Sequence, residues 1–431
     1  MSPPQLPLDI FESVIEHLYD DAESLRRCTL VCKSFVVPSR KRLFTRIYVG
    51  HNRRTDNPNN LPCKQLYKYL TGNPDIVPYV QELWVDGITG DWVFKEETVS
   101  LLLALFAESG GLRVFSIACS LRAPYKKWDS LPILFRQALA HVFHSPQLHT
   151  VHFRLNDSCG CAFPIDLFAT APNLKRLALL GNCASRAVWC PMVDDYWRAS
   201  AHRSRMQHAE GARRLEALEI QALDLRHLLC AVDTPSSPLQ FCGLRELAIR
   251  GGGDYTFFTG FSRILREVTG SIEMLVWHHP SSRRAVDIPT FQQLDRLRTM
   301  VFSITMHQHE YSSLCTVLKD KPFPNTLEQF AIVIEDASYR SIFRCTHRRT
   351  YASHFDDFLH CILGPVQHLR GITVRVVIAE LERAEELGVH TNAGLRAHFP
   401  RLDATGKLSI SLLVGQWDID KITTTLASSL K

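Results

Sequence analysis

One local pattern, apolar-x-x-apolar-x-apolar, recurs along this chain after residue 45 and constrains the fold more than any other feature. The end of each copy alternates apolar and variable positions, which is the spacing of a half-buried β-strand. Amphipathic helical stretches separate the copies, as at 97–108 and 133–143. Because each strand is followed by a helix, we expect parallel strands with right-handed crossovers. The copies are 80–85, 112–117, 148–153, 174–179, 215–220, 244–249, 272–277, 297–302, 327–332 and 369–374.

The spacing of these copies is longer and less regular than that of a uniform repeat array. Their starting positions differ by 25 to 42 residues, whereas regular leucine-rich repeats take about 20 to 29. Since every unit has the same order of strand and helix, the units should stack into an α/β solenoid. The segment 173–182, Asn-Leu-Lys-Arg-Leu-Ala-Leu-Leu-Gly-Asn, resembles a degenerate leucine-rich repeat. Further strands are expected at 43–49 and 408–414, and a non-repetitive α/β domain is the alternative.

A helical pattern occupies residues 1–45, ahead of the solenoid expected at 46–431. Pro7 suits the first turn of a helix, because its missing N–H has no intrahelical partner there. Asp20 and Asp21 are expected to cap a second helix, which Pro38 should end. Three short helices of about 40 residues cannot cover their own apolar surface, so this module needs a partner or a neighbouring domain.

The helical segment resembles the F-box, and in particular the F-box proteins of mushroom-forming fungi. Leu6-Pro7 begins the family pattern, the run Leu30 to Phe35 continues it, and Leu43-Phe44 closes it. Phe35 stands where the family most often has Trp. The resemblance implies docking to the Skp adaptor, and through it to the cullin, of a cullin–RING ubiquitin ligase; the alternative is an amphipathic helical cap on the following domain. It implies an adaptor surface formed by Leu6, Pro7, Ile10, Ile15, Leu18, Leu25, Leu30 and Val31.

The sequence offers little support for catalysis or metal binding. Gly406-Lys407 is followed by Leu408 and so fails as a phosphate-binding loop, and no Gly-x-Ser-x-Gly motif is present. The spacing of the candidate zinc ligands matches no common zinc-binding motif. We therefore expect no enzyme activity, no cofactor and no metal. Those candidate ligands are Cys159, Cys161, Cys183, Cys190 and His202.

Charge and hydropathy exclude further classes of protein. The formal net charge of +5 is small for 431 residues and predicts no nucleic-acid partner. The sequence contains no run of 18 apolar residues, so it predicts no membrane-spanning helix, and it contains no secretory h-region. The 13 cysteines therefore indicate reduced thiols in a cytoplasmic or nuclear protein.

The predicted function is recognition of a substrate protein for an SCF-type ubiquitin ligase. In a leucine-rich-repeat strand the variable positions line the concave face. Trp84, Arg154 and Arg176 are the candidate substrate-binding residues there, because an aromatic anchor with nearby charges is typical of an interaction hot spot. The alternatives are a ligase-independent scaffold and an unrecognised enzyme with a pocket in the solenoid.

Overall fold

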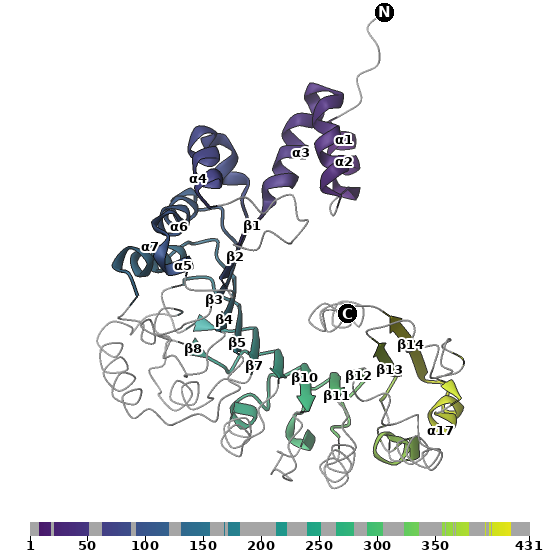
Figure 1. Ribbon diagram of the computed structural model, residues 1–431. Coiled ribbons are helices and arrows are strands. Elements are labelled where there is room, and N and C mark those ends of the chain that lie inside the picture. The colour runs from purple at the N-terminus through teal and green to yellow at the C-terminus, as the bar shows by residue number, and fades with distance from the viewer. Residues whose placement is uncertain are drawn as a thin grey trace, which may run out of the picture. The chain divides into compact units, whose positions relative to one another are not determined.

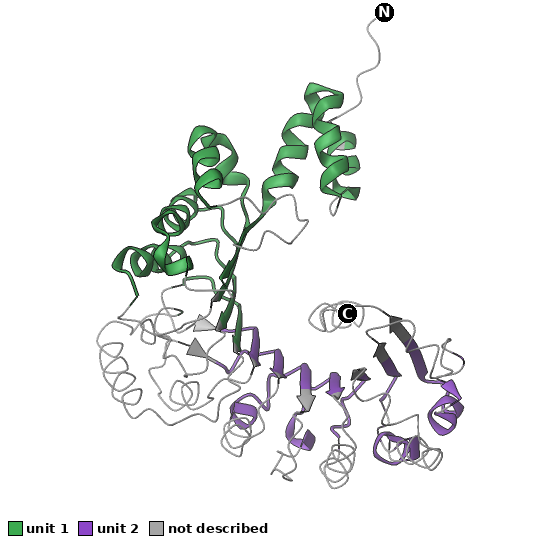
Figure 2. Cartoon of the chain, viewed as in Figure 1, with its two compact units in different colours: residues 1–213, 236–239 green, residues 214–235, 240–431 purple. Residues whose placement is uncertain are grey.

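The computed structural model of the chain divides into two compact units, which Figure 2 shows in different colours. Unit 1 comprises residues 1–213 and 236–239, and unit 2 comprises residues 214–235 and 240–431. The described residues are 8–18, 21–50, 63–87, 92–119, 131–155, 168, 171–181, 213–221, 239–250, 264–279, 291–304, 323–335, 356–357, 359–364, 366, 368–378, 393, 396–397 and 399–414.

Three helices near the N-terminus pack on one another within unit 1 (Figure 1). Ile15 and Leu25 are buried inside this helical module, with 1% and 2% of their surface exposed. The rings of Phe11 and Phe35 meet edge to face, with centroids 4.8 Å apart, and join the first helix to the third. The three helices are α1 (Leu8–His17), α2 (Ala22–Val31) and α3 (Lys33–Thr45).

The expected helix end at Pro38 is wrong, because the chain breaks six residues earlier. Cys32 has extended backbone angles (φ −159°, ψ 164°) and separates α2 from α3. Pro38 lies inside α3, where its missing N–H removes one backbone hydrogen bond. The break at Cys32 assigns Phe35 to α3, and from there its ring reaches Phe11.

Unit 1 continues with five parallel strands in the order β1-β2-β3-β4-β5. Helices follow the strands and lie along one side of β2 to β4 in Figure 1. The strands are β1 (Arg46–Gly50), β2 (Glu82–Gly87), β3 (Val114–Cys119), β4 (Thr150–Leu155) and β5 (Arg176–Gly181). The helices are α4 (Cys63–Gly72), the 3₁₀ helix η1 (Pro74–Tyr79), α5 (Trp92–Lys95), α6 (Glu97–Ser109) and α7 (Ile133–Phe143).

Unit 2 repeats the same sequential arrangement, with strand order β7-β9-β10-β11-β12-β13-β14 and parallel pairing. Its strands are β7 (Ala217–Gln221), β9 (Glu246–Arg250), β10 (Met274–His279), β11 (Thr299–Ile304), β12 (Gln329–Glu335), β13 (Gly371–Ile378) and β14 (Leu408–Val414). Unit 2 also contains η3 (Phe291–Gln293) and α17 (Pro400–Ala404), and the two-residue strands β6 (Arg213–Arg214) and β8 (Leu239–Gln240) each have one residue in either unit.

Every copy of the repeated pattern forms a strand, which confirms the expected α/β class with parallel strands. The first apolar residue of each copy precedes its strand and is buried, from Val80 at 0% exposed to Leu369 at 4%. In unit 1 the two later apolar residues of each copy face the helices of the same unit. On β3, for example, the ring of Phe115 meets Phe143 of α7 edge to face at 6.2 Å. The predicted strand at 408–414 is β14, and β1 begins at Arg46 rather than 43 because α3 continues to Thr45.

The face of the unit 2 sheet formed by the variable positions differs from the sequence-based prediction. Variable positions were expected to be exposed there, yet Val276, Val301, Ala331 and Val333 form a second buried apolar cluster, each at most 3% exposed. Strand register explains the cluster, because Val276, Val301 and Ala331 are paired across β10, β11 and β12. Unit 2 therefore buries apolar side chains on both faces of its central strands.

Candidate protein-interaction surfaces

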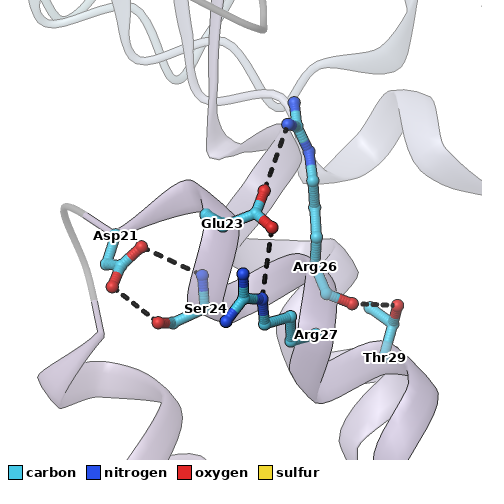
Figure 3. Close-up of polar contacts among 6 residues, drawn as sticks. All are labelled: Asp21, Glu23, Ser24, Arg26, Arg27 and Thr29. Atoms are coloured by element: carbon cyan, nitrogen blue, oxygen red, sulfur yellow. Dashed lines mark hydrogen bonds and ion pairs between the residues drawn. The ribbon is translucent and has the colours of Figure 1, made fainter.

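The start of α2 is fixed by a side-chain cap, which Figure 3 shows. Asp21 accepts hydrogen bonds from the backbone N–H of Ser24 at 2.9 Å and from its hydroxyl at 2.6 Å. These bonds hold the pKa of Asp21 below its usual value, the side-chain bond being the larger cause. Glu23 in the first turn pairs with Arg27 at 3.2 Å. The expected cap at Asp21 is thus confirmed, and Asp20 lies outside the described residues.

The helical module exposes large apolar side chains that its own core does not use. Leu30 and Val31, at the end of α2, are 86% and 68% exposed. Ile10 and Val14 on α1 are 44% and 46% exposed, and Val37 on α3 is 59% exposed. Burying one such side chain contributes about 1.5–3 kcal/mol. The module therefore offers much unused apolar surface to a partner.

The expected adaptor-binding residues separate into two groups by burial. Ile10, Leu30 and Val31 are exposed and Leu18 is half-buried, so these side chains are available for contact. Ile15 and Leu25 are buried, so they support the module's own core instead of presenting surface. Leu6 and Pro7 lie outside the described residues. The expected adaptor-binding set did not include Val14 of α1 or Val37 of α3, and both are exposed.

A second candidate surface is the face of the unit 1 sheet opposite its helices. Strand register sets Tyr48, Trp84, Ser116 and His152 side by side in one row across β1 to β4. Trp84 stacks on Tyr48 with ring centroids 5.8 Å apart. It also meets the ring of His152, 5.5 Å away, across the small side chain of Ser116. Trp84 is therefore held within an aromatic row and keeps part of its surface exposed.

Charged groups beside this aromatic row fix Trp84 further. Arg46 of β1 donates through Nε to Glu82 of β2. The indole Nε1–H of Trp84 lies 3.5 Å from the same Glu82 oxygen, the long limit of a hydrogen bond. Burial lowers the pKa of His152, which Arg176 lowers further and Glu82 opposes. The lowered pKa favours the neutral form of the His152 ring, which contacts Trp84.

The expected substrate-binding set lies on this one face, but the structure spreads it along the strands. Arg176 is paired in register with Thr150, and Arg154 stands four residues further along β4. At about 3.3 Å per residue, the two arginines are separated by roughly 13 Å along the strand direction. Trp84 belongs to the row between them. The three residues therefore frame a broad surface and do not form one compact contact.

Metal binding and membrane insertion find no support in the described part of the chain. No group of three His, Cys, Asp or Glu residues there could hold a metal ion. The cysteines considered for zinc, and His202, lie outside that part. None of the helices described is long and apolar enough to cross a membrane.

No protein-family model matches this chain, and no curated protein matches it.

Proposed function

We propose that this chain is a substrate-recognition subunit of an SCF-type ubiquitin ligase. The helical module docks an Skp-type adaptor, and the strand-and-helix units, read as degenerate leucine-rich repeats, bind a target protein. The chain performs no bond chemistry itself, since its role is to hold a substrate near the ubiquitin-loaded enzyme. The observation that carries the proposal is the exposure of Leu30 and Val31 within the segment that resembles the F-box.

Exposure also decides which substitutions test adaptor docking. Ile15 is buried, so a charge at that position would unfold the module and explain nothing about a partner. Leu30 and Val31 extend into solvent, so charges there leave the folded module intact. Leu30→Asp with Val31→Asp removes apolar contact surface and places two carboxylates in the proposed interface, where unpaired charges are costly.

The test is a pulldown of purified Skp-type adaptor and cullin by the full chain. The double variant of Leu30 and Val31 should lose the adaptor while its circular dichroism spectrum stays that of the wild type. Ile133→Asp with Leu134→Asp is the matched control, because these side chains of α7 are 60% and 51% exposed outside the module. Undiminished adaptor capture by the Leu30/Val31 variant contradicts the docking surface. Capture of adaptor without cullin favours a ligase-independent scaffold.

A further inference from the structure

The residue immediately before each strand occupies an equivalent place in both units, and we call these positions the amino-edge row. They are the first variable position of the repeated pattern, and backbone hydrogen bonds join each one to the next. In unit 2, for example, the N–H of Glu273 donates to the carbonyl of Arg245 at 2.9 Å, and the N–H of Arg298 donates to that of Glu273 at 2.9 Å. The row of unit 2 is Glu216, Arg245, Glu273, Arg298, Glu328 and Arg370.

Charges alternate along the unit 2 row from Glu216 to Arg370, so neighbouring side chains attract one another. Glu328 pairs with Arg370 at 3.4 Å and approaches Arg298 at 4.0 Å. Arg245 approaches Glu273 at 3.9 Å. Strands about 4.8 Å apart bring such side chains together, and opposite charges on adjacent strands stabilise a sheet. The unit 2 row therefore neutralises itself.

The same row in unit 1 has a different composition: Gln81, Arg113, His149 and Lys175. The backbone connection is the same, because the N–H of His149 donates to the carbonyl of Arg113 at 3.0 Å and that of Lys175 to the carbonyl of His149 at 2.9 Å. Arg176 follows Lys175 directly and begins β5. No acidic residue occupies these positions in unit 1. Arg113 and Lys175 therefore do not alternate with glutamates, as the arginines of the unit 2 row do.

The basic side chains of Arg113, Lys175 and Arg176 all influence the pKa of His149, so they lie near its ring. Its pKa is lowered first by burial and then by Arg113, Arg176 and Lys175, while Glu82 opposes the shift. His149 is half-buried, and its ring lies 2.9 Å from the hydroxyl of Thr150. Glu82 also pairs with Arg46, so its charge is already engaged. The edge of β3 to β5 therefore carries three basic side chains, those of Arg113, Lys175 and Arg176, near the ring of His149.

We infer that Arg113, His149, Lys175 and Arg176 form a docking surface for an acidic peptide segment of the substrate protein. Arg113 and Lys175 stand two strands apart, about 10 Å, which matches carboxylates three residues apart on an extended peptide. Arginine donates paired hydrogen bonds to a carboxylate or a phosphate, so phosphoserine suits the same surface. The short length of the row favours a peptide over nucleic acid, which requires a longer basic stripe. This inference rests on the proposed function only in naming the peptide's source.

The test measures fluorescence anisotropy of a labelled short peptide with two glutamates three residues apart. Two comparison peptides carry phosphoserines or glutamines at the same positions. The full-length wild type should bind the acidic peptides, with affinity falling as salt rises, and the glutamine peptide at least about tenfold more weakly. Arg113→Glu with Lys175→Glu should weaken acidic binding by about tenfold or more. Tighter binding of the phosphoserine peptide would identify phosphorylation as the source of charge.

A matched control separates local from overall charge. Lys64→Glu with Lys68→Glu, on exposed positions of α4, makes the same change in net charge and should alter affinity less than about threefold. Arg113→Gln with Lys175→Gln provides a milder variant if reversal disturbs folding. Equal loss in the α4 control, equal binding of the glutamine peptide, or tighter binding of a DNA duplex would overturn the inference. The adaptor pulldown is measured on the same variants, so failure of adaptor docking is recorded separately from failure of this surface.

Discussion

Gly87 offers a sharp test of how β2 packs on the helix that follows it. A Cβ atom at this position would lie 2.2 Å from Cγ2 of Val93 and 3.2 Å from the carbonyl oxygen of Ala118. Carbon atoms in contact are about 3.5–4.0 Å apart, so Val93 would have to move by about 1.3–1.8 Å. Val93 is fully buried and β-branched, which leaves it little freedom to rotate. Gly87→Ala should therefore destabilise unit 1 through overpacking.

The expected cost follows from two opposed effects. Overpacking a close-fitted core costs about 1–3 kcal/mol. Replacing glycine by alanine returns about 0.4–1 kcal/mol, because the unfolded chain loses freedom. The net loss for Gly87→Ala should be about 1–2 kcal/mol. Val93→Ala removes two methyl groups and should cost about 2 kcal/mol through lost burial and a cavity.

The double variant distinguishes overpacking from other causes of instability. The methyl group that Gly87→Ala introduces would occupy the space that Val93→Ala vacates, so the double variant should lose about 2 kcal/mol rather than the sum of about 3–4 kcal/mol. Urea unfolding followed by circular dichroism measures each free energy, with the variants compared at equal slope. Additive losses would show that Gly87 and Val93 do not compete for one space and would refute this reasoning.

Three further predictions concern burial in unit 1. Leu177→Ala should cost about 2–5 kcal/mol because Leu177 is 2% exposed in the core, and Arg176→Ala on the opposite face far less; equal thermal shifts would contradict this orientation. Burial lowers the pKa of His152, so the unfolded ring takes up a proton first and stability should fall as pH drops below 6.5; His152→Phe should flatten this dependence, and an unchanged slope would argue against it. Burial raises the pKa of the Cys63 thiol to about 12, so iodoacetamide should label exposed Cys32 in the native protein but reach Cys63 only after unfolding. Mass spectrometry locates the label, and labelling of Cys63 before Cys32 would contradict this prediction.

Strand positions could be predicted from the sequence because the same side chains are needed in every unit. Leu174, Leu177 and Leu179 are spaced so that each points into one core, and all three are buried. Apolar spacing identifies the face of a strand that turns inward, but it does not show what covers the other face. Val276 and Val301 stand at variable positions and are nevertheless buried, because unit 2 has apolar packing on both sides of its sheet.

The candidate surfaces were less predictable than the fold. The resemblance to the F-box placed Ile15 and Leu30 in one expected adaptor-binding set, although the first is buried and the second is 86% exposed. The packing of α1 and α2 on α3 distinguishes them, since a sequence pattern shows which residues are apolar and does not show which of them a neighbouring helix covers. The basic row at Arg113, His149 and Lys175 could have been found by aligning the first variable position of every repeat. Its contrast with the alternating row of unit 2 becomes informative once the strands are known to be adjacent.

Alternating charge also restricts how the repeats of unit 2 can be gained or lost over evolution. Deleting the repeat that contains Arg298 would bring Glu273 beside Glu328, and deleting the one that contains Glu328 would bring Arg298 beside Arg370. Removing or duplicating two consecutive repeats preserves the order of signs. A pair of consecutive repeats is therefore the smallest unit whose removal keeps neighbouring charges of the row opposite in sign.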